Sequence, residues 1–207
     1  MEKDNHIYMP EDHMENLYNS KNFLVRFVHC QRLDVIVNSV CCNNGMRVLD
    51  AGCGEGQLIE KLYEKNKSNY YGADITEIAL KKAKARCPFA NFSEMNLADL
   101  KFEDGFFDVI IITEVLEHVI EYRAVVAELK RVLKKGGFLI VTFPNEFLWT
   151  VSRFLLGRRP IKVPDHVNSF NPSKIKKLIG MELITRKNLP FGGPFSFSLG
   201  GFMNFKK

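Results

Sequence analysis

Acidic and glycine residues alternate in one short segment behind an apolar run. The segment reads Val48-Leu49-Asp50-Ala51-Gly52-Cys53-Gly54-Glu55-Gly56, and apolar periodicity resumes at Leu58. Glycines at these positions allow a tight turn and let a ligand approach the backbone without a Cβ in the way. A strand, a glycine turn and a helix in this order are typical of a nucleotide-binding βαβ unit.

The charge and the glycine spacing separate two classes of ligand. A dinucleotide fingerprint, G-x-G-x-x-G, requires glycine at position 57, where this chain has Gln57. The Asp50 carboxylate would also lie near a pyrophosphate, and like charges about 4 Å apart cost roughly 1 to 4 kcal/mol. S-adenosylmethionine carries a sulfonium and an ammonium but no phosphate. The segment therefore favours S-adenosylmethionine over the cofactor of a NAD-dependent dehydrogenase.

From Met46 to Ile184 the chain resembles the class I S-adenosylmethionine-dependent methyltransferases, whose first motif ends a strand in an acid followed by G-x-G. The resemblance implies an α/β fold with a doubly wound, Rossmann-like, mostly parallel seven-stranded sheet flanked by helices. It also implies S-adenosylmethionine as the cofactor.

The resemblance assigns cofactor contacts to several strand ends. Asp74 ends a second strand, where an acid can accept both ribose hydroxyls. Asn96 stands where the family usually has an acid, and its side-chain carbonyl can still accept a bond from the adenine amino group. Leu97 would lie against the adenine ring. The full expected set is Asp50, Ala51, Gly52, Cys53, Gly54, Gln57, Asp74, Ile75, Asn96, Leu97 and Thr113.

A second group of chemically active residues follows the central strand. If position 114 begins a helical turn, Glu114, Glu117 and His118 are spaced i, i+3 and i+4 and share one face. The plainest interpretation is that the acids offset a helix dipole and pair with the histidine. A second interpretation makes His118 the general base for transfer to a hydroxyl oxygen. The catalytic candidates are then His118, Glu114 and His166.

A third interpretation is a metal site. Glu114, Glu117 and His118, with His166 from a later segment, form a mixed oxygen and nitrogen set suited to Mg²⁺ or Mn²⁺. This pattern resembles the metal site of the small-RNA 3′-end 2′-O-methyltransferases, and related acids and a histidine occur in the ubiquinone-biosynthesis O-methyltransferases.

The periodicity predicts the elements that position these residues. Strands are expected at 70–75, 92–96, 106–112, 138–143 and 182–189, in addition to the one that ends at Asp50. Helices are expected at 23–40, from 58, from 77 to 86, at 121–134 and at 172–179. The tail, 192–207, could supply an antiparallel seventh strand.

One methyltransferase domain is expected over residues 1–207, with N-terminal lid helices at about 11–42 and an insertion at about 146–171. No signal peptide is visible, and no apolar run reaches the ~18 residues of a membrane span. Five cysteines without a C-x-x-C pair predict reduced thiols and a cytoplasmic location. Cys53 is interpreted as a small residue that fits the glycine turn.

The insertion points to an apolar acceptor. Aromatic and aliphatic residues crowd its first ten positions, and Arg158 and Arg159 follow. This composition suits peripheral contact with a membrane through residues 147–159, or equally a lid over the site. The placement of the insertion resembles the ubiquinone-biosynthesis O-methyltransferases. We therefore expect methylation, at oxygen, of a small quinone- or lipid-like acceptor.

Two alternative functions stay open. One is a metal-dependent 2′-O-methyltransferase acting on RNA ends, since 29 Lys and Arg against 24 Asp and Glu give a net charge of +5. Scattered lysines on helices are usually a solvated face, however, so nucleic acid is not the expected partner. The other is a subunit that binds S-adenosylmethionine without catalysis. The oligomeric state and the methylated atom stay open as well.

Overall fold

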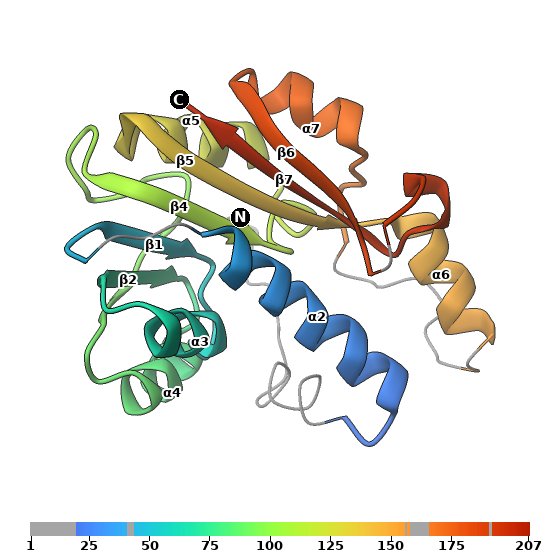
Figure 1. Cartoon of the computed structure of the whole chain (residues 1–207). Helices are drawn as coiled ribbons and strands as arrows, with labels where there is room; N and C mark the ends of the chain where they lie inside the picture. The colour runs from blue at the N-terminus through green and yellow to red at the C-terminus, as the bar shows by residue number, and fades with distance from the viewer. Residues whose placement is uncertain (1–19, 41–43, 156, 158–165, 191) are drawn as a thin grey trace, which may run out of the picture.

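The strands of the fold form one β-sheet, and the expected site residues follow the ends of its strands. The computed structural model describes residues 20–40, 44–155, 157, 166–190 and 192–207 (Figure 1). Residues 11–19 and 41–42 of the expected lid, and residues 156 and 158–165 of the insertion, lie outside this part. The strands are β1 (Arg47–Ala51), β2 (Asn69–Asp74), β3 (Asn91–Glu94), β4 (Phe107–Thr113), β5 (Leu133–Pro144), β6 (Glu182–Leu189) and β7 (Gly200–Lys206). The helices are α2 (Phe23–Ser39), α3 (Gln57–Lys65), α4 (Glu77–Arg86), α5 (Tyr122–Val132), α6 (Glu146–Leu155), α7 (Pro172–Ile179) and the short η1 (Phe195–Phe197).

The seven described strands pair in the order β3-β2-β1-β4-β5-β7-β6. Strands β1 to β5 are parallel, and β7 lies antiparallel between β5 and β6. The strand order reverses between β1 and β4, which is where a doubly wound sheet binds its ligands. The predicted fold class is confirmed, and so is the antiparallel strand in the tail.

Helices cover both faces of the sheet (Figure 1). On one face α2, α3 and α4 bury apolar side chains such as Ile36, Ile59 and Leu80 against Ile111. On the other face α5 and α7 bury a second cluster, which lies over β4 and β5. Each fully buried aliphatic side chain contributes roughly 1.5 to 3 kcal/mol. None of the described helices is long and apolar enough to cross a bilayer.

The junction of α5 and β5 differs from the predicted helix 121–134. Helix α5 ends at Val132 because Leu133 is extended, fully buried and paired with Phe107 of β4. A bulge follows, and Lys134 forms an ion pair with Asp108 at 2.5 Å. The basic and glycine residues thus belong to an irregular strand start, and β5 begins five residues before the predicted 138.

Two further boundaries differ from the expected ones by one or two residues. Strand β3 ends at Glu94, not at 96, because Asn96 begins a turn in which its carbonyl accepts from the Asp99 amide at 3.0 Å. Helix α2 ends at Ser39 and buries polar as well as apolar residues. His29 and Arg32 are both 6% exposed, in line with Leu33 and Ile36, whereas Phe23 at the start is exposed.

Candidate active site

The glycine turn after β1 has the backbone conformation that its composition predicts. Gly52 and Gly56 have φ of +81° and +83°, in the left-handed region. The amides of Gly52 and Cys53 donate to the Ala73 carbonyl at 2.7 and 3.2 Å, which ties the turn to the end of β2. A Cβ at Gly52 would lie 2.4 Å from a methyl group of Val115. The glycine is therefore required by packing as well as by φ.

Two acids lie together at this turn. Asp50 is buried, and its burial, followed by the neighbouring Asp74 carboxylate, raises its pKa to about 7. Asp74 accepts hydrogen bonds from the amides of Gly54 at 2.8 Å and Thr76 at 2.9 Å. Nothing in the described part of the chain lowers the Asp50 pKa. A ligand with a positive charge would do so, and S-adenosylmethionine fits this acid pair for that reason.

The remaining expected cofactor residues surround the same edge of the sheet. Ala51 is the last residue of β1, Gln57 begins α3, and Ile75 is 48% exposed beyond β2. Asn96 is exposed, and its Oδ1 already accepts from the Ala98 amide at 2.9 Å. Its second lone pair is what adenine recognition would use. Leu97 and Cys53 are buried as well, and both side chains belong to the apolar core clusters.

Cys53 has the environment of a structural residue. Burial and the Asp50 carboxylate raise the pKa of its thiol well above the usual value, so the thiol stays neutral. Cys30, Cys53 and Cys87 are free thiols, as the reduced state predicts, while Cys41 and Cys42 lie outside the described residues.

The segment after β4 is a turn, and the predicted helical turn from 114 was wrong. Glu114 has φ of +53°, and its amide continues the pairing of β4 with β5 by donating to the Thr142 carbonyl. The next bonds, His118 to Val115 and Val119 to Leu116, each span three residues. Glu114 therefore does not share a helical face with Glu117 and His118.

Glu117 and two histidines meet beside this turn. One ligand atom from each of Glu117, His118 and His166 lies within 4.8 Å of the others. The imidazole rings of His118 and His166 meet edge to face, with centroids 4.6 Å apart. Burial, followed by the Glu114 charge, raises the pKa of Glu117 well above its usual value.

The insertion docks onto the turn through its backbone, which explains how His166 reaches His118. The amides of Val167 and Asn168 donate to the Glu117 carbonyl at 2.9 and 3.0 Å, and the Asn168 side chain donates to Val119 at 2.8 Å. His166 Nδ1 lies 2.6 Å from a carboxylate oxygen of Glu146, the first residue of α6.

Glu114 instead contacts α2. Its carboxylate lies 3.0 Å from the Arg32 guanidinium, which is also 3.0 Å from His29 Nδ1. Thr113 precedes this ion pair, and its buried hydroxyl has no hydrogen-bond partner among the described residues. The site thus consists of an acid pair at β1 and β2, and a polar cluster at the ends of β4 and β5.

The sequence analysis did not identify Arg32 and Glu146 as residues of the site. Arg32 carried a signal, because it interrupts the apolar stripe of α2 one residue before Leu33, where a solvated arginine is not expected. Glu146 carried none, since its pairing with His166 depends on how the insertion folds back.

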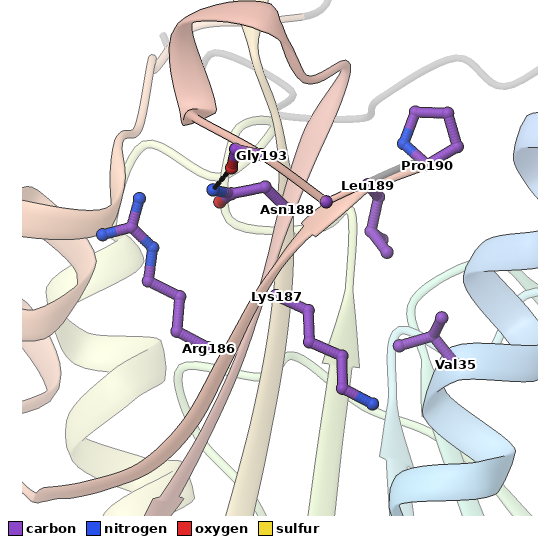
Figure 2. Close-up of a pocket in the computed structure, with 8 residues that line it drawn as sticks. Val35, Arg186, Lys187, Asn188, Leu189, Pro190 and Gly193 are labelled. Carbon is purple, nitrogen blue, oxygen red and sulfur yellow. Dashed lines mark hydrogen bonds between the residues drawn. The ribbon is translucent and has the colours of Figure 1, made fainter.

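A pocket of about 310 Å³ opens at the same edge of the sheet but at the outer strand β6 (Figure 2). Figure 2 shows Lys187 and Val35 between β6 and α2, and Asn188 bonded to the Gly193 carbonyl at 2.6 Å. None of the expected site residues lines this pocket. The acid pair lies at β1 and β2, and the histidines lie at the end of β4, away from this pocket.

The comparisons agree with the class that this fold and acid pair define. Residues 49–141 match the methyltransferase domain family. Relatives that match this chain are named as S-adenosylmethionine-dependent and ubiquinone-biosynthesis methyltransferases. The class that these findings support is the class I S-adenosylmethionine-dependent methyltransferases.

Individual relatives match this chain over part of their own length. A probable S-adenosylmethionine-dependent methyltransferase of Mycolicibacterium smegmatis is 31% identical over 65% of this chain and 50% of its own length. A ubiquinone biosynthesis O-methyltransferase of Mesorhizobium japonicum is 28% identical over 68% of this chain and 60% of its own. The chain spans about half the length of the first curated relatives it matches.

A solved structure shows the same fold over nearly the whole chain. Magnesium protoporphyrin IX methyltransferase from Synechocystis, determined with bound SAH, has a TM-score of 0.72 at 22% identity. The match covers 95% of this chain and 93% of that one.

Proposed function

We propose that this chain transfers a methyl group from S-adenosylmethionine to an oxygen of a small, hydrophobic, quinone- or lipid-like acceptor. The observation that carries the proposal is the acid pair at the glycine turn, in which Asp50 is buried and Asp74 is partly exposed. A pair of adjacent carboxylates favours a cationic ligand and disfavours a phosphate. The cofactor, when bound, supplies an electrophilic methyl group on its sulfonium.

Each cofactor contact is assigned by position. The free lone pairs of Asp74 would accept the ribose hydroxyls, and Asn96 the adenine amino group, with Leu97 beside the ring. Asp50 and the glycine turn would hold the charged end of the cofactor, next to Thr113. All these residues lie at the carboxyl edge of strands β1 to β4, where the sheet order reverses.

The histidine pair is assigned the role of the base that takes the hydroxyl proton of the acceptor. Methyl transfer to a hydroxyl oxygen forms the oxygen–carbon bond and releases the hydroxyl proton, so a base must lie nearby. His118 and His166 lie at the end of β4, and Glu146 orients the ring of His166. Glu114 acts as a positioning residue, because its carboxylate is held by Arg32.

Two observations support a hydrophobic acceptor. Helix α6 exposes Phe147, Phe154 and Leu155 next to the site, and one relative is named for ubiquinone biosynthesis. We propose a cytoplasmic protein that meets its acceptor at a membrane surface through α6. For an RNA acceptor a basic trough would be expected, yet Lys61, Lys81 and Lys82 each pair with an acid.

The test measures cofactor binding and methyl transfer separately. Purified chain is titrated with S-adenosylmethionine by calorimetry, then incubated with labelled cofactor and prenylated catechols, simple phenols or RNA oligonucleotides. His118→Ala should lower transfer to the preferred acceptor by roughly 100-fold or more and leave cofactor affinity unchanged. The control is Glu121→Gln, an exposed acid near the same turn.

Each alternative has its own outcome. Transfer to RNA ends and not to catechols would replace the acceptor class. Cofactor binding without transfer to any acceptor would favour the non-catalytic subunit. Full activity in the His118→Ala variant would remove this histidine from the reaction.

A further inference from the structure

Strand β6 has an outer side that pairs with no other described strand. It is the last strand in the order of the sheet, and among the described strands it pairs only with β7. Its eight residues compare with four in β3, the outer strand at the other end of the sheet. A row of backbone amide and carbonyl groups along β6 is therefore open to pairing with a further strand.

The pocket of about 310 Å³ lies along this outer side. Figure 2 shows Lys187 pointing between β6 and α2, toward Val35, whereas Arg186 and Asn188 point to the opposite side of the strand. The lining thus alternates between the two faces, as successive residues of a strand do. A compact ligand on one face would contact only part of this lining. An extended peptide beside β6 would present alternate side chains to both faces.

Arg186 and Lys187 place positive charge on both faces of this outer strand. Both residues are exposed, and neither forms an ion pair with an acid in the part of the chain that the structure describes. The Lys187 ammonium lies instead 5.9 Å from the centroid of the Phe202 ring on β7. A second copy of β6 would bring the same two cations, and like charges that face each other destabilise paired strands. The charges therefore disfavour self-association and favour a strand that carries acids.

We propose that the outer side of β6 binds an extended, acidic segment of a partner protein as a further strand of the sheet. Backbone hydrogen bonds to β6 would supply affinity, and acids on the two faces of the segment would meet Arg186 and Lys187. One end of β6 is closed by a turn, in which the Gly192 amide donates to the Asn188 carbonyl at 2.8 Å. The docked segment would therefore lie beside residues 183–187.

The experiment measures the binding of synthetic peptides to the full chain by fluorescence anisotropy. The probe is a labelled peptide as long as β6, with two adjacent central glutamates flanked by threonine and valine, and its match has lysine at both glutamate positions. The acidic peptide should bind at least about 10-fold more tightly than the lysine peptide at low salt. N-methylation of its backbone amides removes the donors for strand pairing and should lower its affinity by about 10-fold or more.

Charge reversal on β6 is the matched test in the protein. The double variant Arg186→Glu/Lys187→Glu should invert the preference, so that the lysine peptide binds about 10-fold more tightly than the acidic one. The control Lys176→Glu/Lys177→Glu makes the same change in charge at two exposed positions of α7 and should keep the preference of the parent chain. Circular dichroism checks that each variant is folded.

Amide hydrogen exchange locates the bound peptide. The acidic peptide should slow exchange in Glu182–Leu189 and leave Asn91–Glu94 of β3 unchanged. The proposal is overturned if the acidic peptide does not bind, if the N-methylated peptide binds equally well, or if the α7 control loses as much affinity as the β6 variant. Dimerisation of the parent chain with slowed exchange in β6 would make a second copy the occupant instead. None of these readouts depends on methyl transfer, so the proposal and the proposed function fail separately.

Discussion

The Arg32 guanidinium of α2 lies 3.0 Å from the Glu114 carboxylate after β4, with the two side chains only 7% and 20% exposed. This ion pair joins α2 to the turn that carries Glu117 and His118. Glu114 reaches it by adopting a left-handed backbone conformation, which is uncommon for a residue other than glycine. The position of α2 and the shape of the turn are therefore coupled.

Replacement of Arg32 should destabilise the protein. Arg32→Met leaves Glu114 partly buried without its cation, and we expect a loss of roughly 3 kcal/mol in the free energy of unfolding. Urea denaturation measures this loss. The matched control is Lys61→Met, which removes an exposed ion pair with Asp34 on the same side of the molecule and should cost less than about 1 kcal/mol. Equal losses in the two variants would show that the Arg32 pair has no special role.

Cofactor affinity should depend on pH through Asp50. The pKa of this carboxyl group is raised to about 7 by burial and by Asp74, and the cationic cofactor prefers the ionised form. Binding should therefore strengthen by up to tenfold per pH unit as the pH rises toward about 7, and then level off. Calorimetry between pH 5 and 8.5 measures this. Asp50→Asn should bind weakly with a flatter profile.

The same shift predicts an opposite trend for the stability of the cofactor-free chain. Because the folded-state pKa of Asp50 lies above its unfolded value of 3.8, the folded state retains a proton that the unfolded chain loses. Stability should fall as the pH rises from about 4 to 7, by at most ~4 kcal/mol for this group. Asp50→Asn should be more stable than the parent at pH 8. A destabilised variant would contradict this origin of the shift.

Asp74 should contribute directly to cofactor affinity. Asp74→Ala removes the charge-assisted bonds proposed to the ribose, and we expect a loss of ~2 kcal/mol in binding free energy. The same carboxylate also accepts from the amides of Gly54 and Thr76, so the turn loosens as well. Thermal unfolding of the free chain separates the two effects. The exposed Glu77→Gln serves as the control, and unchanged affinity in Asp74→Ala would refute the ribose assignment.

The sheet was predictable because its residues obey local rules. The apolar run at β4 has no polar face, and that pattern requires cover on both sides. Pro172 after Asn171 begins a helix, Gly180 ends it, and the structure shows α7 with the Asn171 side chain accepting from the Lys174 amide. Local sequence carries such signals within one or two turns.

The polar cluster was only partly predictable, because its geometry depends on distant contacts. The helical spacing of Glu114 and Glu117 predicts one face, but pairing with Arg32 and with the Thr142 carbonyl favours a left-handed residue at 114. His166 was recognised as a candidate by its residue type. Its orientation by Glu146 required the fold, since neither residue is near the other in sequence.

The apolar face of α6 should bind membranes. This helix, labelled α6 in Figure 1, buries none of its residues completely. Phe147 and Phe154, two turns apart, are 73% and 65% exposed. Two phenylalanines that leave water at a bilayer surface each contribute on the order of 1 kcal/mol or more. The double variant Phe147→Ser/Phe154→Ser should therefore lower partitioning onto anionic vesicles by about 10-fold or more, as measured by co-sedimentation. Ile184→Ser on the outer strand β6, which is 46% exposed, should have no effect. The membrane role is contradicted if the parent chain does not sediment with vesicles, or if Ile184→Ser loses as much binding. The exposed face of α6 would then act as a lid over the site, and the acceptor would reach the site from solution.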